Sequence, residues 1–315
     1  MTLRIDGPVL VIGDLVVDVL IQSASKQVYA GDTSGQIRFL PGGSAANQAV
    51  WLARLGMPVL FAGQVGDDPL GHFLVEDLRR EGVEPRVSFD PDHATGSVAL
   101  MVDAAGERSM ITSRTANARL DMIDSPGAPS ENLSSLLDGV RHVQLSGYGL
   151  VGQELRDKTC RVIEECLDRG TPVSMDPSSH SLLAKELEPD EFFRLTRGLE
   201  ILFPSLEEGR YLTGLTEPLE VAEALLQYYP LVILKLGREG SLIGTQLVPT
   251  NAVKPLDTTG AGDAFCAAFL AAYLSGSTPV EAARQANALA RLVVQHKGAR
   301  PTLPDMGTTI SSNQP

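Results

Sequence analysis

The sequence is organised around one stretch, LDTTGAGDAF at residues 256–265. A short apolar run of strand type, LVILKL at residues 231–236, precedes it. Residues 264–274 follow it and are rich in Ala, Phe and Leu without a helix breaker, which indicates a buried helix. The Gly-Ala-Gly-Asp element therefore stands where a loop enters a helix.

This position suits an anion. Two glycines let the backbone turn tightly and approach a ligand closely, and the free N–H groups and dipole of a helix start favour negative charge. We therefore predict an anion hole at Gly260, Ala261 and Gly262 that holds a transferring phosphoryl group. Asp263 stands at the same place and is suited to take a proton from an attacking hydroxyl. The alternative interpretation is a capped helix with Asp263 in its first turn.

A second glycine-rich turn opens another helix about two hundred residues earlier. PGGSAANQA at residues 41–49 runs into VWLARLG at residues 50–56, where Gly56 is placed to end the helix. The two motifs, in this order, resemble the two signatures of the ribokinase-like (PfkB) carbohydrate kinases. The resemblance covers almost the whole chain. It is specific as to fold and reaction, and weak as to the substrate.

Strands and helices alternate along the second half of the chain, which predicts an α/β fold with a doubly wound, mostly parallel sheet flanked by helices. The apolar run VLVIG at residues 9–13 is typical of a central strand. Polar, β-rich segments at about 19–40 and 95–115 predict a small second sheet, which in the family is a lid over the sugar. We expect one kinase domain over residues 1–306 and a disordered tail over 307–315.

Composition excludes several classes of protein. The chain has 315 residues, is 43% hydrophobic and carries a formal net charge of −13. This acidic balance argues against a nucleic-acid or membrane partner. Three cysteines, odd in number and without metal-ligand spacing, favour a reducing compartment over a disulfide framework. No apolar run is long enough to span a bilayer, and acidic residues interrupt the N-terminal apolar run, unlike in a signal peptide. A cytoplasmic enzyme is the simplest class.

The resemblance implies a set of residues around the sugar. An acceptor-only carboxylate at Asp18 suits substrate hydroxyls, and the Asn47 amide can both donate and accept. Each has a structural alternative: Asp18 as a turn aspartate, and Asn47 bonding local backbone. Where the family often has Gly-Ala-Asn, this chain has Thr115 in place of the glycine. The implied substrate-binding residues are Asp18, Gly42, Gly43, Asn47 and Asn117.

The resemblance also implies an ATP and Mg²⁺ end. Lys235 is a candidate phosphate contact, with a surface lysine at a strand end as the alternative. Glu208 matches the glutamate that orders Mg²⁺-bound waters, although Ser205 replaces the family's asparagine. Asn287 matches a position near adenine. The implied nucleotide-binding residues are Lys235, Gly237, Gly240 and Asn287, and Glu208 reaches Mg²⁺ through water.

Two further segments resemble those that hold a monovalent cation in ribokinase. They are DTT at residues 257–259 and the loop GARPT at residues 298–302. Hard oxygen ligands fit such a cation, and a plain loop is the alternative. The implied K⁺ ligands are the side chain of Asp257, the carbonyls of Thr259, Val293, His296 and Gly298, and Thr302.

Two functions of different class follow. The first is an enzyme that uses ATP to phosphorylate the hydroxymethyl group of a sugar or sugar-like substrate, a reaction that depends mostly on positioning and charge stabilisation. The second is a non-catalytic binding protein on the same fold, which the retained Asp263 disfavours. Within the enzyme class a nucleoside kinase is the alternative, with Tyr29, Phe39 and Tyr148 as possible walls for a base. The resemblance also implies a homodimer through the lid.

Overall fold

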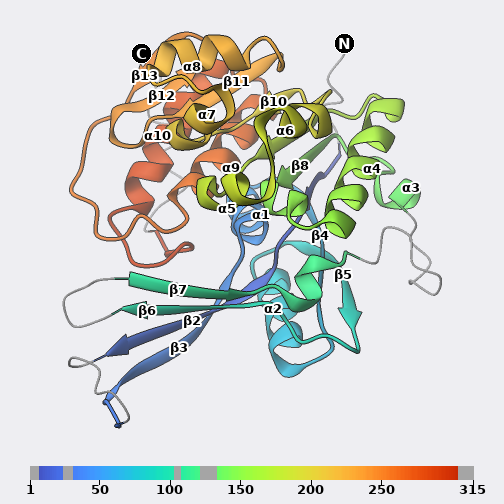
Figure 1. The fold of residues 1–315 in the computed structure, drawn as a ribbon, viewed down its shortest axis with the longest axis vertical. Coiled ribbons are helices and arrows are strands. Elements are labelled where there is room, and N and C mark those ends of the chain that lie inside the picture. The colour runs from blue at the N-terminus through green and yellow to red at the C-terminus, as the bar shows by residue number, and fades with distance from the viewer. Residues whose placement is uncertain (1–6, 24–30, 103–107, 121–132, 304–315) are drawn as a thin grey trace.

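A nine-stranded sheet forms the body of the protein in the computed structural model, which describes residues 7–23, 31–102, 108–120 and 133–303. The strand order is β13-β12-β11-β10-β9-β8-β1-β4-β5 (Figure 1). Strands β11 to β5 in this order are parallel, whereas β12 and β13 form an antiparallel hairpin at one edge. The strands are β1 (Val9–Ile12), β4 (Val59–Gly66), β5 (Glu84–Asp90), β8 (His142–Ser146), β9 (Val173–Asp176), β10 (Ile201–Leu202), β11 (Leu231–Lys235), β12 (Gly240–Ile243) and β13 (Gln246–Pro249).

Strand β1 shows why this sheet is covered on both faces. Its four side chains are all buried, and because successive side chains point to opposite faces, they enter two different cores. Val9 and Val11 belong to one hydrophobic cluster, and Leu10 and Ile12 to the other. The apolar run therefore forms the central parallel strand that the sequence predicts.

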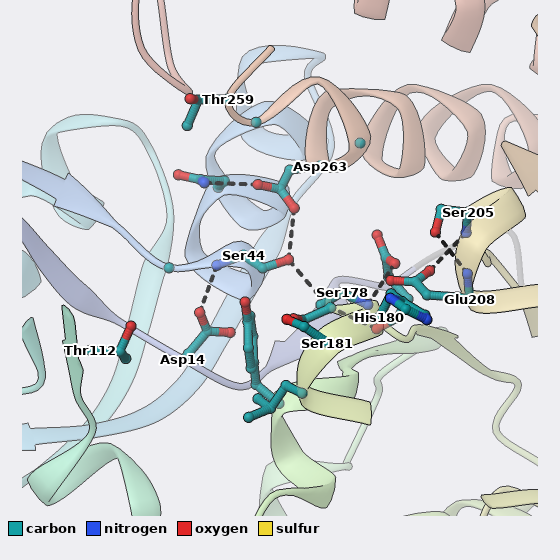
Figure 2. Close-up of a pocket in the computed structure, with 18 of the residues that line it drawn as sticks. Asp14, Ser44, Thr112, Ser178, His180, Ser181, Ser205, Glu208, Thr259 and Asp263 are labelled. Atoms are coloured by element: carbon teal, nitrogen blue, oxygen red, sulfur yellow. Dashed lines mark hydrogen bonds between the residues drawn. The ribbon is translucent and has the colours of Figure 1, made fainter. Parts of the chain in front are cut away.

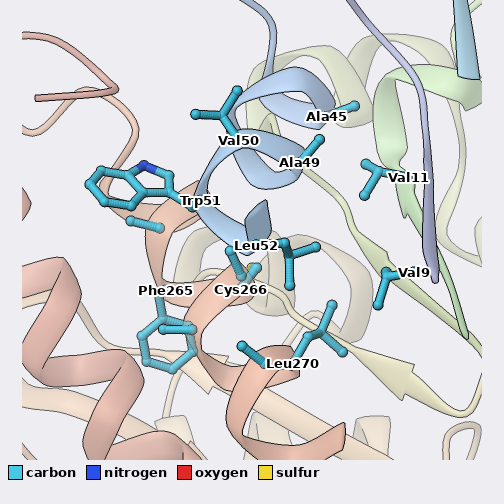
Figure 3. Packing of buried hydrophobic residues seen from close by; sticks show 14 of the residues in the cluster. Val9, Val11, Ala45, Ala49, Val50, Trp51, Leu52, Phe265, Cys266 and Leu270 are labelled. Carbon is cyan, nitrogen blue, oxygen red and sulfur yellow. The ribbon is translucent and has the colours of Figure 1, made fainter. Parts of the chain in front are cut away.

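Two groups of helices supply these cores. The first cluster contains residues of α1, α2, α9 and α10, and Figure 3 shows Ala45 and Ala49 of α1 directed toward Val11. The second contains residues of α3 to α8. The doubly wound, mostly parallel fold is thus confirmed. The helices are α1 (Ser44–Arg54), α2 (Pro69–Arg80), α3 (Leu133–Leu136), α4 (Gln153–Arg169), α5 (His180–Glu186), α6 (Pro189–Leu195), α7 (Leu206–Thr213), α8 (Pro218–Leu225), α9 (Ala261–Leu274) and α10 (Pro279–Val293).

A separate four-stranded sheet, in the order β3-β2-β6-β7, projects from this body (Figure 1). We call it the small sheet. Its strands are β2 (Val16–Ser23), β3 (Gly35–Gly42), β6 (Ser97–Val102) and β7 (Arg108–Ser113). Strand β2 begins four residues after β1 ends, and β3 leads directly into α1, so the small sheet is joined to the centre of the body by very short connections.

Element boundaries differ from the sequence expectation by a few residues. Helix α9 begins at Ala261 rather than 264, because Gly260 adopts a left-handed conformation (φ 73°) and the helical turn starts directly after it. The tail expected at 307–315 lies outside the described residues. Among the described residues, no helix combines the length and the apolar character needed to cross a bilayer.

Candidate active site

The carboxyl ends of the parallel strands open into a cavity of about 1050 Å³. Such ends are where ligands bind in open α/β sheets. Figure 2 shows side chains from distant parts of the chain converging here: Asp14 and Ser44 beside Asp263, Thr112 from the small sheet on one side, and Glu208 on the other. The two glycine-rich motifs therefore form one site.

Asp263 lies in the first turn of α9 and is held by side chains of α1. Ser44 Oγ donates to its Oδ1 at 2.7 Å, and Asn47 Nδ2 donates to its Oδ2 at 2.8 Å. Burial raises the pKa of Asp263 to about 6. The two hydrogen bonds lower it, and the nearby Asp176 and Asp14 carboxylates raise it. A carboxylate with this pKa is ionised at neutral pH and is still basic enough to accept a proton.

The glycines before Asp263 have different roles. A Cβ on Gly260 would lie 2.5 Å from Ala299 Cβ, so this glycine permits close packing of the C-terminal loop, 298–303. A Cβ on Gly262 would meet only Lys235 Nζ, at 3.7 Å, so the space before the helix is open. The Ala261 N–H points back to the Thr258 carbonyl at 3.3 Å. The Ala261 N–H is therefore not free to bind an anion. Among the described residues, the free N–H groups at this helix start are those of Gly260, Gly262 and Asp263.

Asp18 lies at the base of the small sheet and lines the cavity. Burial raises its pKa to about 6, the Arg300 guanidinium lowers it, and Asp14 raises it. A Cβ on Gly42 would lie 2.5 Å from Asp18 Oδ2, so the glycine makes room for this carboxylate. Gly43 has φ 103°, and a Cβ there would lie 2.4 Å from the Asp14 carbonyl. Both glycines thus shape the backbone around the two aspartates.

Asp14 is a site residue to which the sequence analysis gave no role. Its Oδ2 accepts from the Ser44 N–H at 2.7 Å and its Oδ1 from the Ala45 N–H at 3.2 Å. It caps α1 from outside the helix, because the residue before the helix, Gly43, has no side chain to do so. A glycine at an N-cap could have indicated that another acidic residue supplies the cap.

The two asparagines expected to bind substrate are already hydrogen-bonded. Asn117 Oδ1 accepts from the Leu15 N–H and its Nδ2 donates to the Leu15 carbonyl, both at 2.8 Å. Asn47 Oδ1 accepts from Arg300 Nε at 2.7 Å, while its Nδ2 faces Asp263. Both asparagines line the cavity wall, and each uses its amide to fix another group there.

Arg300 is a second residue that the sequence analysis missed. Its side chain is 6% exposed, and its Nη1 pairs with Asp77 of α2 at 2.8 Å. Together with the bond to Asn47, this contact connects α2 and the C-terminal loop to the α1 residue that holds Asp263. Only the spatial meeting of distant segments reveals this role, because the sequence around Arg300 shows no catalytic pattern.

At the opposite end of the cavity, Lys235 Nζ lies 2.9 Å from both oxygens of Asp176. Burial lowers the pKa of Lys235, but Asp176, Cys266 and Glu208 together outweigh burial and keep this pKa above its usual range. The alternative of a surface lysine is therefore wrong.

Glu208 lies near Lys235. Burial raises the pKa of Glu208, and the positive charge of Lys235 lowers it. Glu208 also closes a capping box with Ser205, whose N–H donates to Oε2 at 2.7 Å.

Of the other predicted nucleotide-binding residues, only Gly237 is among the residues that line the cavity. Gly240, with φ 107°, begins β12, and a Cβ there would lie 2.2 Å from the Val248 carbonyl. Asn287 is buried in α10, where its Nδ2 donates to the Val248 carbonyl at 2.9 Å. It is not among the cavity-lining residues described, because its amide ties α10 to the β12–β13 hairpin.

The segments expected to hold K⁺ do meet. Asp257 Oδ1 accepts from the N–H and Oγ1 of Thr259 at 3.0 and 2.7 Å, and its Oδ2 accepts from the Gly298 N–H at 3.0 Å. The Val293 carbonyl accepts from the His296 N–H. Thr302 is exposed further along the same loop. The loop is thus organised, and the cation itself stays a prediction.

Of the three aromatic residues predicted as walls for a nucleobase, the two that the structure describes lie in different surroundings. Tyr148 lines the cavity. Phe39 is paired with Val19 and is 56% exposed, whereas the neighbouring residue Asp18 lines the cavity. Because side chains alternate along a strand, Phe39 points away from the cavity, and the sequence expectation for it was wrong. Tyr29 lies outside the described residues.

Comparison with known proteins agrees with this geometry. The family model described as pfkB family carbohydrate kinase matches residues 8–306. The chain belongs to the pfkB family of carbohydrate kinases. Membership makes it an ATP-dependent carbohydrate kinase, and the predicted family and fold are confirmed.

Individual pfkB relatives leave the substrate open. A ribokinase of Bacillus subtilis (strain 168) is 30% identical, with 93% of this chain and 95% of that protein covered. The structure of Arabidopsis thaliana ribokinase complexed with ribose and ATP has a TM-score of 0.76 at 28% identity, covering 93% and 94% of the chains. An adenosine kinase from Sinorhizobium meliloti has a TM-score of 0.80 at 25% identity, covering 94% and 96%. Sugar and nucleoside kinases are thus both similar to this chain.

Proposed function

We propose that this pfkB kinase transfers the γ-phosphoryl group of ATP to the hydroxymethyl group of a sugar or sugar-like substrate, with Asp263 as the general base. Asp263 takes the hydroxyl proton as the oxygen attacks phosphorus, and ADP leaves. The free amides at the start of α9 stabilise the charge on the transferring group. Asp18 accepts hydrogen bonds from the substrate hydroxyls.

The observation that carries this proposal is the position of Asp263. It shares the first turn of α9 with open backbone N–H groups, and it faces the cavity beside Ser44. A base and an anion site within one helical turn are what a displacement at phosphorus requires, because positioning and charge stabilisation supply most of the rate.

The residues present fit a nucleotide and Mg²⁺ at the Lys235 end. Asp176, Glu208 and Lys235 all line the cavity there, so two carboxylates and one ammonium border the same space. Mg²⁺ prefers oxygen ligands and usually keeps several waters, which these carboxylates can accept. When bound, Mg²⁺ would neutralise charge on the ATP phosphates, and Lys235 would contact them.

The test is Asp263→Asn, which keeps the shape of the side chain and removes its basicity. We expect ATP turnover, measured over a panel of pentoses, hexoses, sugar acids and nucleosides, to fall about a hundredfold or more, while calorimetry shows ATP binding preserved. Asp168→Asn, an exposed aspartate on α4, is the matched control. Turnover close to that of the unmodified protein would exclude Asp263 as the base.

A nucleoside kinase is the second candidate. The observations that favour it are the likeness to an adenosine kinase and the presence of Tyr148 in the cavity wall. An aromatic ring there could stack on a base. The same panel decides between them, because a nucleoside kinase would turn over adenosine in preference to free ribose.

We also infer that two copies of the chain pair through the small sheet. Asp18, Val98 and Thr112 line the cavity, so the residues beside them in each strand face outward. Three of the outward residues are large, apolar and exposed: Ile37 at 62%, Phe39 at 56% and Ile111 at 65%. An apolar face that no described part of the chain covers is typical of a protein interface.

A reducing compartment such as the cytoplasm is part of the same proposal. Its support is that Cys160, Cys166 and Cys266 are all free thiols, and free buried thiols are common in proteins kept under reducing conditions.

A further inference from the structure

Arg114 lines the same cavity as Asp18 and Asp263, yet its guanidinium makes no hydrogen bond or ion pair with any described residue. The other fully charged cation described in the wall, Lys235, is paired with Asp176 at 2.9 Å. Arg114 is instead stacked on Tyr148, with its Cζ 4.4 Å from the ring centroid. Stacking holds the plane of the guanidinium and leaves its five N–H donors free.

The backbone holds Arg114 in place. Thr115, directly after it, has φ 41°, a conformation that costs free energy for a residue other than glycine. The Thr115 hydroxyl and the Ala116 N–H both donate to the Ala94 carbonyl, at 2.6 and 3.2 Å, and the Asn117 amide is fixed on Leu15. A strained turn secured by this many bonds keeps the arginine at the cavity wall.

The position of Arg114 belongs to the sugar end of the cavity. It directly follows β7, whose Thr112 also lines the cavity, and Figure 2 shows Glu208 on the side of the cavity away from Thr112. A ligand group that meets Arg114 is therefore part of the phosphoryl acceptor rather than of ATP.

We propose that Arg114 binds an anionic group on the acceptor substrate, so that the preferred acceptor is a sugar acid or a sugar phosphate rather than a neutral sugar. This inference rests on the proposed kinase function. Carboxylate and phosphate oxygens both match the fork of a guanidinium, which can bind them with two parallel hydrogen bonds. The carboxylates of Asp14 and Asp18 repel an anion, so without Arg114 this end of the cavity selects against one.

The competing role for Arg114 is a counter-charge that lowers the repulsion between Asp14 and Asp18 and serves neutral substrates equally. The two roles differ in a measurable way. A counter-charge affects neutral and anionic acceptors alike, whereas a direct contact affects only the anionic ones.

The experiment compares acceptors that differ only in the charged group: gluconate with sorbitol, and fructose 6-phosphate with fructose. We expect kcat/KM for at least one anionic member to exceed that of its neutral partner about tenfold or more. Arg114→Met should lower kcat/KM for that anion by about ten- to a hundredfold, the usual effect of losing a hydrogen bond to a charged group. The neutral partner should change less than about threefold. The pair whose anionic member loses activity in Arg114→Met shows whether Arg114 binds a carboxylate or a phosphate.

Arg114→Lys is the second variant, because it keeps the charge and loses the fork, and it should recover only part of the anion preference. Arg284→Met, an exposed arginine on α10, is the control and should leave both acceptors unchanged. Thermal melting confirms that each variant folds, and calorimetry with the anion checks the loss of binding directly.

Equal kcat/KM for anionic and neutral members in the unmodified protein would overturn this inference and leave the kinase intact, as would an equal loss for both in Arg114→Met. Absence of ATP turnover with any sugar, acid, phosphate or nucleoside would instead refute the proposed function, and this inference with it.

Discussion

Asp263 owes its orientation to a chain of hydrogen bonds that leads away from the cavity. Asn47 can present its amide donor to Asp263 because Arg300 occupies its carbonyl oxygen. Without that guanidinium the Asn47 amide is free to turn over and place an acceptor against the carboxylate. Arg300 is therefore a positioning residue, although it lies behind the wall rather than in it.

Arg300→Met should raise the pKa of Asp263, because the donor from Asn47 lowers it. Activity needs Asp263 ionised, so kcat/KM falls as the pH drops through about 6. If the pKa of Asp263 is raised in the variant, this fall begins at a higher pH than in the unmodified protein. We expect the acid limb of the kcat/KM profile to move up by about one pH unit. Arg284→Met, on the exposed face of α10, should leave the limb in place. An unshifted limb in the Arg300 variant would show that its role is only structural.

Asp18 illustrates a conflict between binding and stability. Its folded pKa of about 6 exceeds the unfolded value of 3.8, so the native state holds the proton more tightly and loses stability as the pH rises from about 4 to about 6. Asp18→Asn should therefore increase the free energy of unfolding at pH 7.5 by about 3 kcal/mol and leave it unchanged near pH 3. Urea unfolding at the two pH values measures this.

The same Asp18 variant should bind the acceptor sugar more weakly, because a charged acceptor of substrate hydroxyls is lost, and should bind ATP as before. Calorimetry that finds unchanged sugar affinity would remove Asp18 from the substrate site, whatever the effect on stability.

At the scale of elements, the site is made where α1 and α9 begin. Both helices start after a glycine with positive φ, Gly43 at 103° and Gly260 at 73°. The loop before α9 is fixed by Asp257, which binds the backbone of Thr259 and of Gly298. Whatever holds this loop also holds the N–H groups at the start of α9.

We expect K⁺ to raise the rate above that in Na⁺ or Tris buffer, mainly through kcat, because a preorganised anion hole lowers the barrier without tightening ground-state binding. Asp257→Ala should abolish the response to K⁺. Since this variant also loses hydrogen bonds to Thr259 and Gly298, the decisive measurement is the ratio of rates with and without K⁺. Equal rates for the unmodified protein in K⁺ and Tris at matched ionic strength would exclude the cation site.

Local signals predicted much of this architecture. The VLVI run forms the central strand, Gly56 follows the end of α1 in a left-handed conformation, and the two glycine-rich motifs meet in one cavity. The contacts of Arg300 and the burial of Asn287 could not be predicted, because they depend on elements that meet only after folding. A sequence pattern does not show when the hydrogen-bonding groups of a polar side chain are already bonded to a neighbouring residue.

At the scale of the whole molecule, the small sheet has two faces with different tasks. Register places Val19 opposite Phe39 and Ala99 on the outer face, next to Asp18 on the inner one. One strand thus contributes both to the cavity and to the exposed apolar surface. Pairing of two copies through that surface would restrain the strands that carry the substrate residues.

Ile111→Lys on the outer face should convert a dimer into a monomer, because burying an unpaired charge at an interface is costly. Sedimentation at several concentrations measures the mass. The control is Leu247→Lys, which changes a residue of similar exposure, 53%, on β13 of the main sheet. A monomeric unmodified protein, or an Ile111 variant that stays dimeric, would contradict pairing through this face.

The bonds that join Asp263 to Ser44 and Asn47, and Asn47 to Arg300, span most of the chain. During synthesis on a ribosome the α1 residues emerge early, but the base and its positioning arginine emerge last. A nascent chain released before residue 300 would contain Asp263, Ser44 and Asn47 but would lack Arg300, which orients the Asn47 amide. Such fragments keep the base and lack its positioning arginine, so those that fold should show the same shifted pH response as Arg300→Met.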